Sequence, residues 1–296
     1  MTVDASHGAH VARARAAPEP TPHPALEVDE VSLRFGALWA LTDVGFEVAE
    51  GELFAIIGPN GAGKTSLFNL LSRVYDPTRG RLRCFGTDMA GLRPHSLARA
   101  GIARTFQNLG LFPHSSVLDN VLVGRGHLMH AGTVRAGLMF PSARREERQN
   151  RAAAMTALTS VGLASFASRP VGTLPYGVQK RVELARALAM EPRLLLLDEP
   201  VAGMSRAERG EIVQLVRTIH NERGITIVLV EHDMSVVMGL AERVLVLDFG
   251  RSIALGSPAE IQANPEVIRA YLGEPVRTET SQPPTWDPGA VARGGR

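Results

Sequence analysis

The chain has 296 residues, of which 45% are hydrophobic, 21% charged and 5% aromatic, a composition typical of a globular protein. Its formal net charge of +2 does not indicate a nucleic-acid-binding protein, and its single cysteine excludes an intramolecular disulfide and a multi-cysteine zinc site. No apolar run approaches the roughly 20 residues that cross a bilayer, and residues 1–24 lack the apolar region of a secretory signal, so we expect a cytoplasmic protein.

The first half of the chain predicts strands followed by a helical region. Residues 1–24 are rich in Ala, Pro and Arg and are expected to be disordered. Alternating apolar residues predict strands over 26–35 and about 40–48, and a short apolar run predicts a buried strand over 53–57. A helix over 64–73 and a strand over 80–85 follow, and apolar residues recur at helical spacing within 116–165.

From residue 178 onward the pattern alternates between helix and strand. Helices are predicted over 178–190 and 206–221, and strands over 194–197, 225–230 and 244–248. Apolar strands separated by amphipathic helices predict a parallel sheet that is covered on both faces. The sequence therefore predicts an α/β core over about 25–274 with an α-helical insertion, and a second disordered end over 275–296.

A glycine-rich turn follows the third predicted strand and matches the pattern G-x-x-x-x-G-K-[ST] in full. Glycines allow backbone N–H groups to converge on phosphate oxygens, and the helix that follows adds its positive N-terminal end. Lys64 is expected to reach the β- and γ-phosphates, and the Thr65 hydroxyl to bind Mg²⁺. The nucleotide-binding residues predicted here are Gly58, Pro59, Asn60, Gly61, Ala62, Gly63, Lys64, Thr65 and Ser66.

A second pattern is a run of four leucines that ends in two acids, Asp198 and Glu199. A buried strand would bring these carboxylates to the edge of the sheet beside the phosphate loop. Asp198 is placed there to hold Mg²⁺, as the strand-end Asp of phosphate-loop NTPases does, and Glu199 to polarise the attacking water.

Two further polar residues indicate which kind of NTPase this is. Gln107 lies at a predicted strand end before the helical insertion, in Arg-Thr-Phe-Gln, and His232 follows the strand 225–230, in Glu-His-Asp-Met. The order of phosphate loop, Gln, Asp-Glu and His resembles that of the ATP-binding cassette (ABC) ATPases. The resemblance covers about residues 25–274 and implies the ABC cassette fold of phosphate-loop NTPases. That fold has a parallel-sheet core, an N-terminal antiparallel β subdomain and an inserted α-helical subdomain, here at about 108–175.

The resemblance also implies roles for single residues. Phe35 looks like the aromatic residue that stacks on adenine, Glu199 like the catalytic base and His232 like the switch histidine. Gln107 resembles the residue that contacts the metal and links it to the membrane subunits. The segment 202–205 resembles the loop that touches a second ATPase, because two ATPases of this family close head to tail around ATP and Mg²⁺.

The sequence departs from the family where the signature L-S-G-G-Q is expected. Here it has Pro175, Tyr176 and Gly177, so the glycine is kept while proline replaces the serine. The serine hydroxyl is therefore missing from the contacts expected with the partner's nucleotide, while the backbone contacts to a γ-phosphate are kept. The segment is, however, similar to the signature of the first ATP-binding subunit of branched-chain (hydrophobic) amino-acid importers, as are the Glu-His-Asp-Met motif and the ending over 264–273.

The resemblance implies an ATPase that couples ATP hydrolysis to amino-acid uptake at the cytoplasmic face of the cell membrane. Its expected partners are a second ABC ATPase, two membrane permease subunits and, indirectly, an extracytoplasmic solute-binding protein, with no nucleic acid. Two alternatives remain open at this stage. One is an importer of another small solute, such as urea or amides, and the other is a soluble ABC ATPase without a transport role.

The chain holds only two lysines among its 32 basic residues, and both fall in these motifs. Lys64 is expected to be required as a compact charge between phosphates, where a planar guanidinium would not fit. Lys180 lies just after the signature, where either basic residue is expected to serve.

Overall fold

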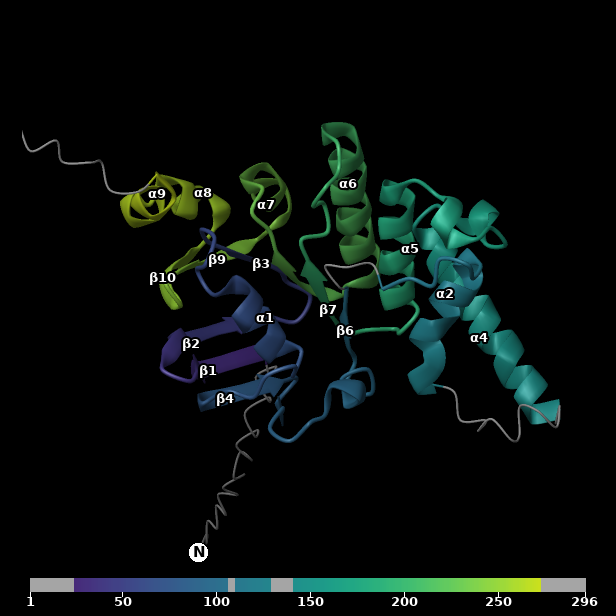
Figure 1. Ribbon diagram of the computed structural model, residues 1–296, viewed down its shortest axis with the longest axis horizontal. Helices are drawn as coiled ribbons and strands as arrows, with labels where there is room; N and C mark the ends of the chain where they lie inside the picture. Colours follow the sequence, from purple (N-terminus) through teal and green to yellow (C-terminus); the bar gives the residue numbers. More distant parts are fainter. Residues whose placement is uncertain (1–23, 106–109, 129–140, 273–296) are drawn as a thin grey trace, which may run out of the picture.

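The computed structural model describes residues 24–105, 110–128 and 141–272 (Figure 1). The disorder predicted for the two ends falls on residues 1–23 and 275–296, outside the described residues, and Gln107 also lies outside them.

An antiparallel sheet is formed by the first part of the described chain. Its strands are β1 (Leu26–Phe35), β2 (Leu38–Val48), β4 (Arg79–Cys84) and β5 (Thr87–Asp88), in the order β2-β1-β4-β5. Along β2 the buried residues alternate with exposed ones from Val44 to Val48, as expected for a sheet with one covered face. The strands predicted over 26–35, 40–48 and 80–85 therefore belong to this antiparallel sheet.

A second, six-stranded sheet carries the predicted nucleotide motifs. Its order is β10-β9-β3-β8-β7-β6, in which all neighbours are parallel except the edge pair β9 and β10. Every residue of β3, β7 and β8 is buried. Because these strands are adjacent and parallel, their three carboxyl ends meet at one edge of the sheet. The strands are β3 (Leu53–Ile57), β6 (Ile102–Arg104), β7 (Leu194–Asp198), β8 (Thr226–Val230), β9 (Arg243–Asp248) and β10 (Arg251–Gly256).

Both faces of this sheet are covered, which confirms the predicted α/β class. On one face lie α1 (Lys64–Leu71) and the antiparallel sheet, and there the rings of Phe46 and Phe54 stack at 5.2 Å. The other face packs against α6 (Arg206–Arg223), α7 (Met234–Leu240), α8 (Pro258–Ala263) and α9 (Pro265–Leu272). Figure 1 shows α6, α7, α8 and α9 side by side along that face.

The helical part lies beside β6 and β7 (Figure 1) and comprises α2 (Val117–Gly124), α4 (Pro141–Ser160) and α5 (Tyr176–Leu188). These three helices pack on one another, and α5 also contributes buried residues to the apolar core that α6 forms against the sheet. Arg125, which is buried, joins them because its guanidinium donates to Asn150 and to the Ala189 carbonyl and pairs with Glu191. Short 3₁₀ turns cover Pro94–Ser96, Arg125–Leu128, Ala164–Phe166 and Val171–Thr173. None of the helices that the structure describes is long and apolar enough to cross a membrane.

Candidate nucleotide site

The phosphate loop connects the buried strand β3 to α1. Gly58 has φ of 151°, and an added Cβ would lie 2.2 Å from the Leu247 carbonyl oxygen, so only glycine fits there. Gly63, with φ of 100°, precedes the first residue of α1, and no side chain caps that helix start. The backbone N–H groups at the start of α1 are therefore left for an anion, which the helix dipole also favours.

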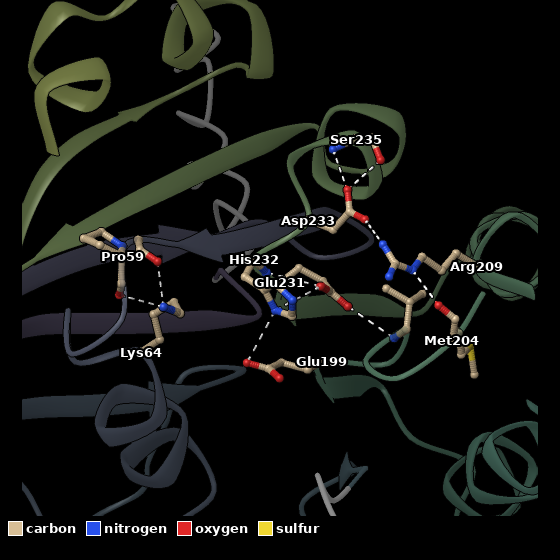
Figure 2. Close-up of polar contacts among 11 residues, drawn as sticks. Pro59, Lys64, Glu199, Met204, Arg209, Glu231, His232, Asp233 and Ser235 are labelled. Atoms are coloured by element: carbon tan, nitrogen blue, oxygen red, sulfur yellow. Dashed lines mark hydrogen bonds and ion pairs between the residues drawn. The ribbon is translucent and has the colours of Figure 1, made fainter. Parts of the chain in front are cut away.

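Lys64 folds back over this loop. Its ammonium donates to the carbonyl oxygens of Gly58 at 2.6 Å and Pro59 at 2.9 Å, and its side chain is buried (Figure 2). Burial lowers the pKa of Lys64, and the nearby Glu199 carboxylate opposes this shift. The lysine is thus a compact cation held within the loop that a phosphate would occupy.

Asp198 ends β7 and lies beside Arg104, the last residue of β6. The guanidinium donates to the Asp198 carboxylate at 2.8 Å, and the two side chains are only 13% and 7% exposed. Thr65 and Asp198 line the same cleft, of about 760 Å³, which extends toward the helical part. A hydroxyl and a carboxylate are oxygen ligands of the kind that Mg²⁺ prefers, so this donor set fits the metal that the sequence predicts.

Glu199 and His232 face each other across the carboxyl ends of β7 and β8. The His232 Nδ1 lies 3.7 Å from a carboxylate oxygen of Glu199, and the two side chains are 58% and 24% exposed (Figure 2). Glu199 has φ of 46°, a left-handed conformation that is unfavourable for a residue with a Cβ, and its N–H donates to the Val230 carbonyl. Strained backbone of this kind is found most often at functional sites.

Phe35 lies at the end of β1, and the residue is 43% exposed. It contacts the ring of Tyr75 edge-on, at 5.0 Å between centroids, so one edge is supported by the neighbouring aromatic residue. Stacking of Phe35 on adenine stays a prediction.

The segment from Pro175 to Gly177 opens α5, two residues earlier than the predicted helix. It lies against the loop after β7, because an added Cβ on Gly203 would meet the Tyr176 ring at 3.5 Å. It also lies against the first turn of α6, because an added Cβ on Gly177 would meet Glu208 at 2.9 Å. The Tyr176 side chain is itself 43% exposed, so this segment presents an aromatic group at the surface.

Comparison with known proteins agrees with this arrangement. A family model described as ABC transporter matches residues 41–202, and one described as branched-chain amino acid ATP-binding cassette transporter matches residues 251–277. The chain belongs to the ATP-binding cassette transporter family. It is 41% identical to the high-affinity branched-chain amino acid transport ATP-binding proteins BraF of Pseudomonas aeruginosa and LivG of Escherichia coli K12. Each alignment spans 251 residues, which is 85% of this chain and 98% of the relative.

A solved structure has the same fold. The crystal structure of a nucleotide-free ATP-binding cassette from an ABC transporter is matched with a TM-score of 0.74 and 28% identity, over 85% of this chain and all of that one. The predicted ABC cassette fold and ATPase class are thus confirmed, and the chain is an ATP-binding component of a transport system.

Three residues for which the sequence predicted no role contact the predicted site residues or the loop that carries them. Arg104 pairs with Asp198, and Glu231 and Asp233, which flank His232, bond to the loop after Glu199 or to the helix that follows it. Arg104 belongs to the motif Arg-Thr-Phe-Gln, and Glu231 and Asp233 belong to Glu-His-Asp-Met. Membership of these two motifs is the sequence feature that could have pointed to all three residues.

Lys180 of the cassette is buried and pairs with the buried Glu183, at 3.3 Å from ammonium to carboxylate. The expectation that arginine would serve equally well at this position stays a prediction.

Proposed function

We propose that this cassette is the ATP-hydrolysing subunit of an importer for branched-chain amino acids or closely related ones. The observation that carries the catalytic part is the convergence of Lys64, Glu199 and His232 beside Asp198 at one edge of the sheet. The substrate class is supported by the 41% identity to two branched-chain amino acid transport proteins over almost their whole length.

The residues of the loop are assigned to ATP binding. The phosphate oxygens would accept hydrogen bonds from the backbone N–H groups of residues 60–66, and Lys64 would leave its two carbonyl partners to contact the β- and γ-phosphates. Phe35 stacks on the adenine. Thr65, Asp198 and Gln107 would hold Mg²⁺, which would supply positive charge to neutralise the phosphate oxygens.

Hydrolysis is assigned to the two side chains that face each other. The Glu199 carboxylate orients a water molecule toward the γ-phosphate, and the His232 imidazole stabilises the charge that develops on the transferred phosphoryl group. Glu199 is partly exposed and close to Lys64, so both the water and the phosphate can reach it.

The partners are assigned as the family resemblance implies. A second ATPase would receive the segment 175–177 at its own nucleotide, because this segment lies against the loop after β7 and presents Tyr176 outward. Gln107 and the helical part would contact two permease subunits, which places the cassette peripherally at the cytoplasmic face of the membrane. A solute-binding protein on the other side would act through the permeases.

The experiment that tests this proposal is ATP turnover and solute uptake by the complete transporter reconstituted in vesicles. Glu199→Gln should preserve ATP binding and reduce turnover and leucine uptake by at least 100-fold. Normal turnover by Glu199→Gln would refute the assignment of the base. Uptake of urea or amides without leucine would refute the substrate class, and a complex that purifies with no polytopic protein would refute transport.

A further inference from the structure

Glu231 directly follows β8 and has a fully buried carboxylate. One of its oxygens accepts the N–H of Val201 at 3.2 Å, and the other accepts the N–H of His232 at 3.2 Å (Figure 2). Burial raises the pKa of Glu231, while the N–H groups of Val201, His232 and Asp233 oppose this effect by bonding to the charged form. A single acidic side chain therefore joins the backbone of two loops that follow neighbouring strands.

The loop of residues 199–205 is the one that Glu231 reaches, and a second bridge holds it as well. The Asp233 carboxylate pairs with Arg209 at 2.6 Å, and the Arg209 Nε donates to the Met204 carbonyl at 3.0 Å. Both bridges are drawn in Figure 2, where they run from the His232 segment toward the same loop. Glu231 and Asp233, on either side of His232 in the sequence, thus connect the histidine to the 199–205 loop at Val201 and, through Arg209, at Met204.

We infer that Glu231 is a positioning residue, which ties the 199–205 loop to the backbone of His232 and so fixes the Glu199 carboxylate relative to the imidazole. Stability alone does not account for a carboxylate here, because a buried charge is costly and an apolar residue of similar volume generally serves as well. The two oxygens instead satisfy one N–H on each loop, which an apolar side chain cannot do. Glu199 needs such an anchor because its own backbone is in the left-handed region.

This inference rests on the proposed roles of Glu199 and His232, and Glu231→Gln tests it with little change in shape. The amide nitrogen cannot accept a hydrogen bond, so one of the two backbone N–H groups loses its partner. In the reconstituted transporter we expect kcat for ATP to fall about tenfold or more, which corresponds to about 1.4 kcal/mol. The KM and the affinity for a fluorescent ATP analogue should stay within about twofold, because the phosphate loop is untouched.

Glu52→Gln is the matched control. Glu52 is also a buried glutamate, accepts a backbone N–H from Ala49 at 2.7 Å and pairs with Arg243, on β9. We expect both variants to lower the melting temperature and only Glu231→Gln to lower kcat. Equal kcat for Glu231→Gln and the wild type, or an equal loss in the Glu52→Gln control, would overturn the inference.

A double-mutant cycle separates this inference from the proposed function. If Glu231 acts by positioning the Glu199 carboxylate, adding Glu231→Gln to Glu199→Gln should change the residual kcat by less than about twofold, and a full tenfold further loss would overturn the inference. The proposed function fails instead if His232→Ala or Glu199→Gln keeps normal turnover. Arg209→Gln cuts the second bridge at a partly exposed side chain and should lower kcat about two- to fivefold, so the idea stays testable if Glu231→Gln does not fold.

Discussion

Replacement of Arg104 by methionine would remove the cation that pairs with Asp198 in the cleft beside the phosphate loop. The guanidinium donates to the Asp198 carboxylate at 2.8 Å and to the Asn69 side chain at 2.9 Å, and it lies 5.0 Å from the centre of the Phe68 ring. Methionine keeps much of the aliphatic stem, so the change mainly tests the charge and the hydrogen bonds.

The expected cost follows from how little of the pair is exposed. The Arg104 side chain is 13% exposed and that of Asp198 is 7% exposed, so removing one partner leaves a nearly buried carboxylate without its cation. Breaking a buried pair in this way costs about 3–5 kcal/mol, and some access to water through the cleft favours the lower end. We therefore expect about 3 kcal/mol less stability and, for a domain of this size, a melting temperature lower by about 6–12 °C.

Urea denaturation of the nucleotide-free protein measures this cost, and a double-mutant cycle with Asp198→Asn isolates the pair. Because the double variant has no uncompensated charge, its loss should be smaller than the sum of the single losses by about 1–3 kcal/mol. Glu50→Gln is the control, since it breaks a pair with Arg193 in which both side chains are more than half exposed, and it should cost under about 1 kcal/mol. Additive losses, or an Arg104→Met cost as small as that of the control, would refute the reasoning.

Three further outcomes are expected. Hydrogen bonds from Ser235, and then the Arg209 guanidinium, lower the pKa of Asp233, so it adds stability above its unfolded pKa of about 3.9 that is lost as the pH falls through the folded value. Asp233→Asn should therefore flatten the stability curve in urea titrations below about pH 4, and an unchanged slope would contradict this. Burial raises the pKa of Cys84 to about 12. Alkylation of this thiol by iodoacetamide at pH 8 should therefore be about 1000-fold slower in the folded than in the urea-unfolded protein. Comparable rates would count against a buried thiol. Gly58→Ala should abolish folding or ATP binding, because the added Cβ would lie 2.2 Å from the Leu247 carbonyl oxygen. Gly61 has open space around it, so Gly61→Ala should lower the free energy of unfolding by only about 1 kcal/mol. Circular dichroism and ATP titration distinguish the two variants.

Some elements of the fold could not be predicted from the sequence because they are short or only partly buried. Strand β10 has no fully buried residue, so no apolar run marks it in the sequence. Helices α7 and α8 have seven and six residues, and α9 has eight and begins at Pro265, directly after Asn264. Apolar periodicity needs several turns before it stands out, so none of these was expected.

The site was predictable to the extent that its residues are contiguous in sequence. The loop 58–65, the pair Asp198 and Glu199, and His232 were each found from a local motif after a strand. The structure brings Glu199 and His232 to 3.7 Å and Lys64 near Glu199. The roles of Phe35, Gln107 and the segment 175–177 stay predictions.

The sequence by itself determined the α/β class, the family and the chemistry of the phosphate loop, because strand periodicity and a loop-forming motif are encoded by neighbouring residues. Only the tertiary structure decided what holds that chemistry in place. Arg104 meets Asp198 across 94 positions and Glu231 meets Val201 across 30, because β6, β7 and β8 are adjacent in the sheet. Strand order depends on the packing of the whole sheet, so no local sequence pattern encodes it. The contacts of the buried acids Asp198 and Glu231 both result from that strand order.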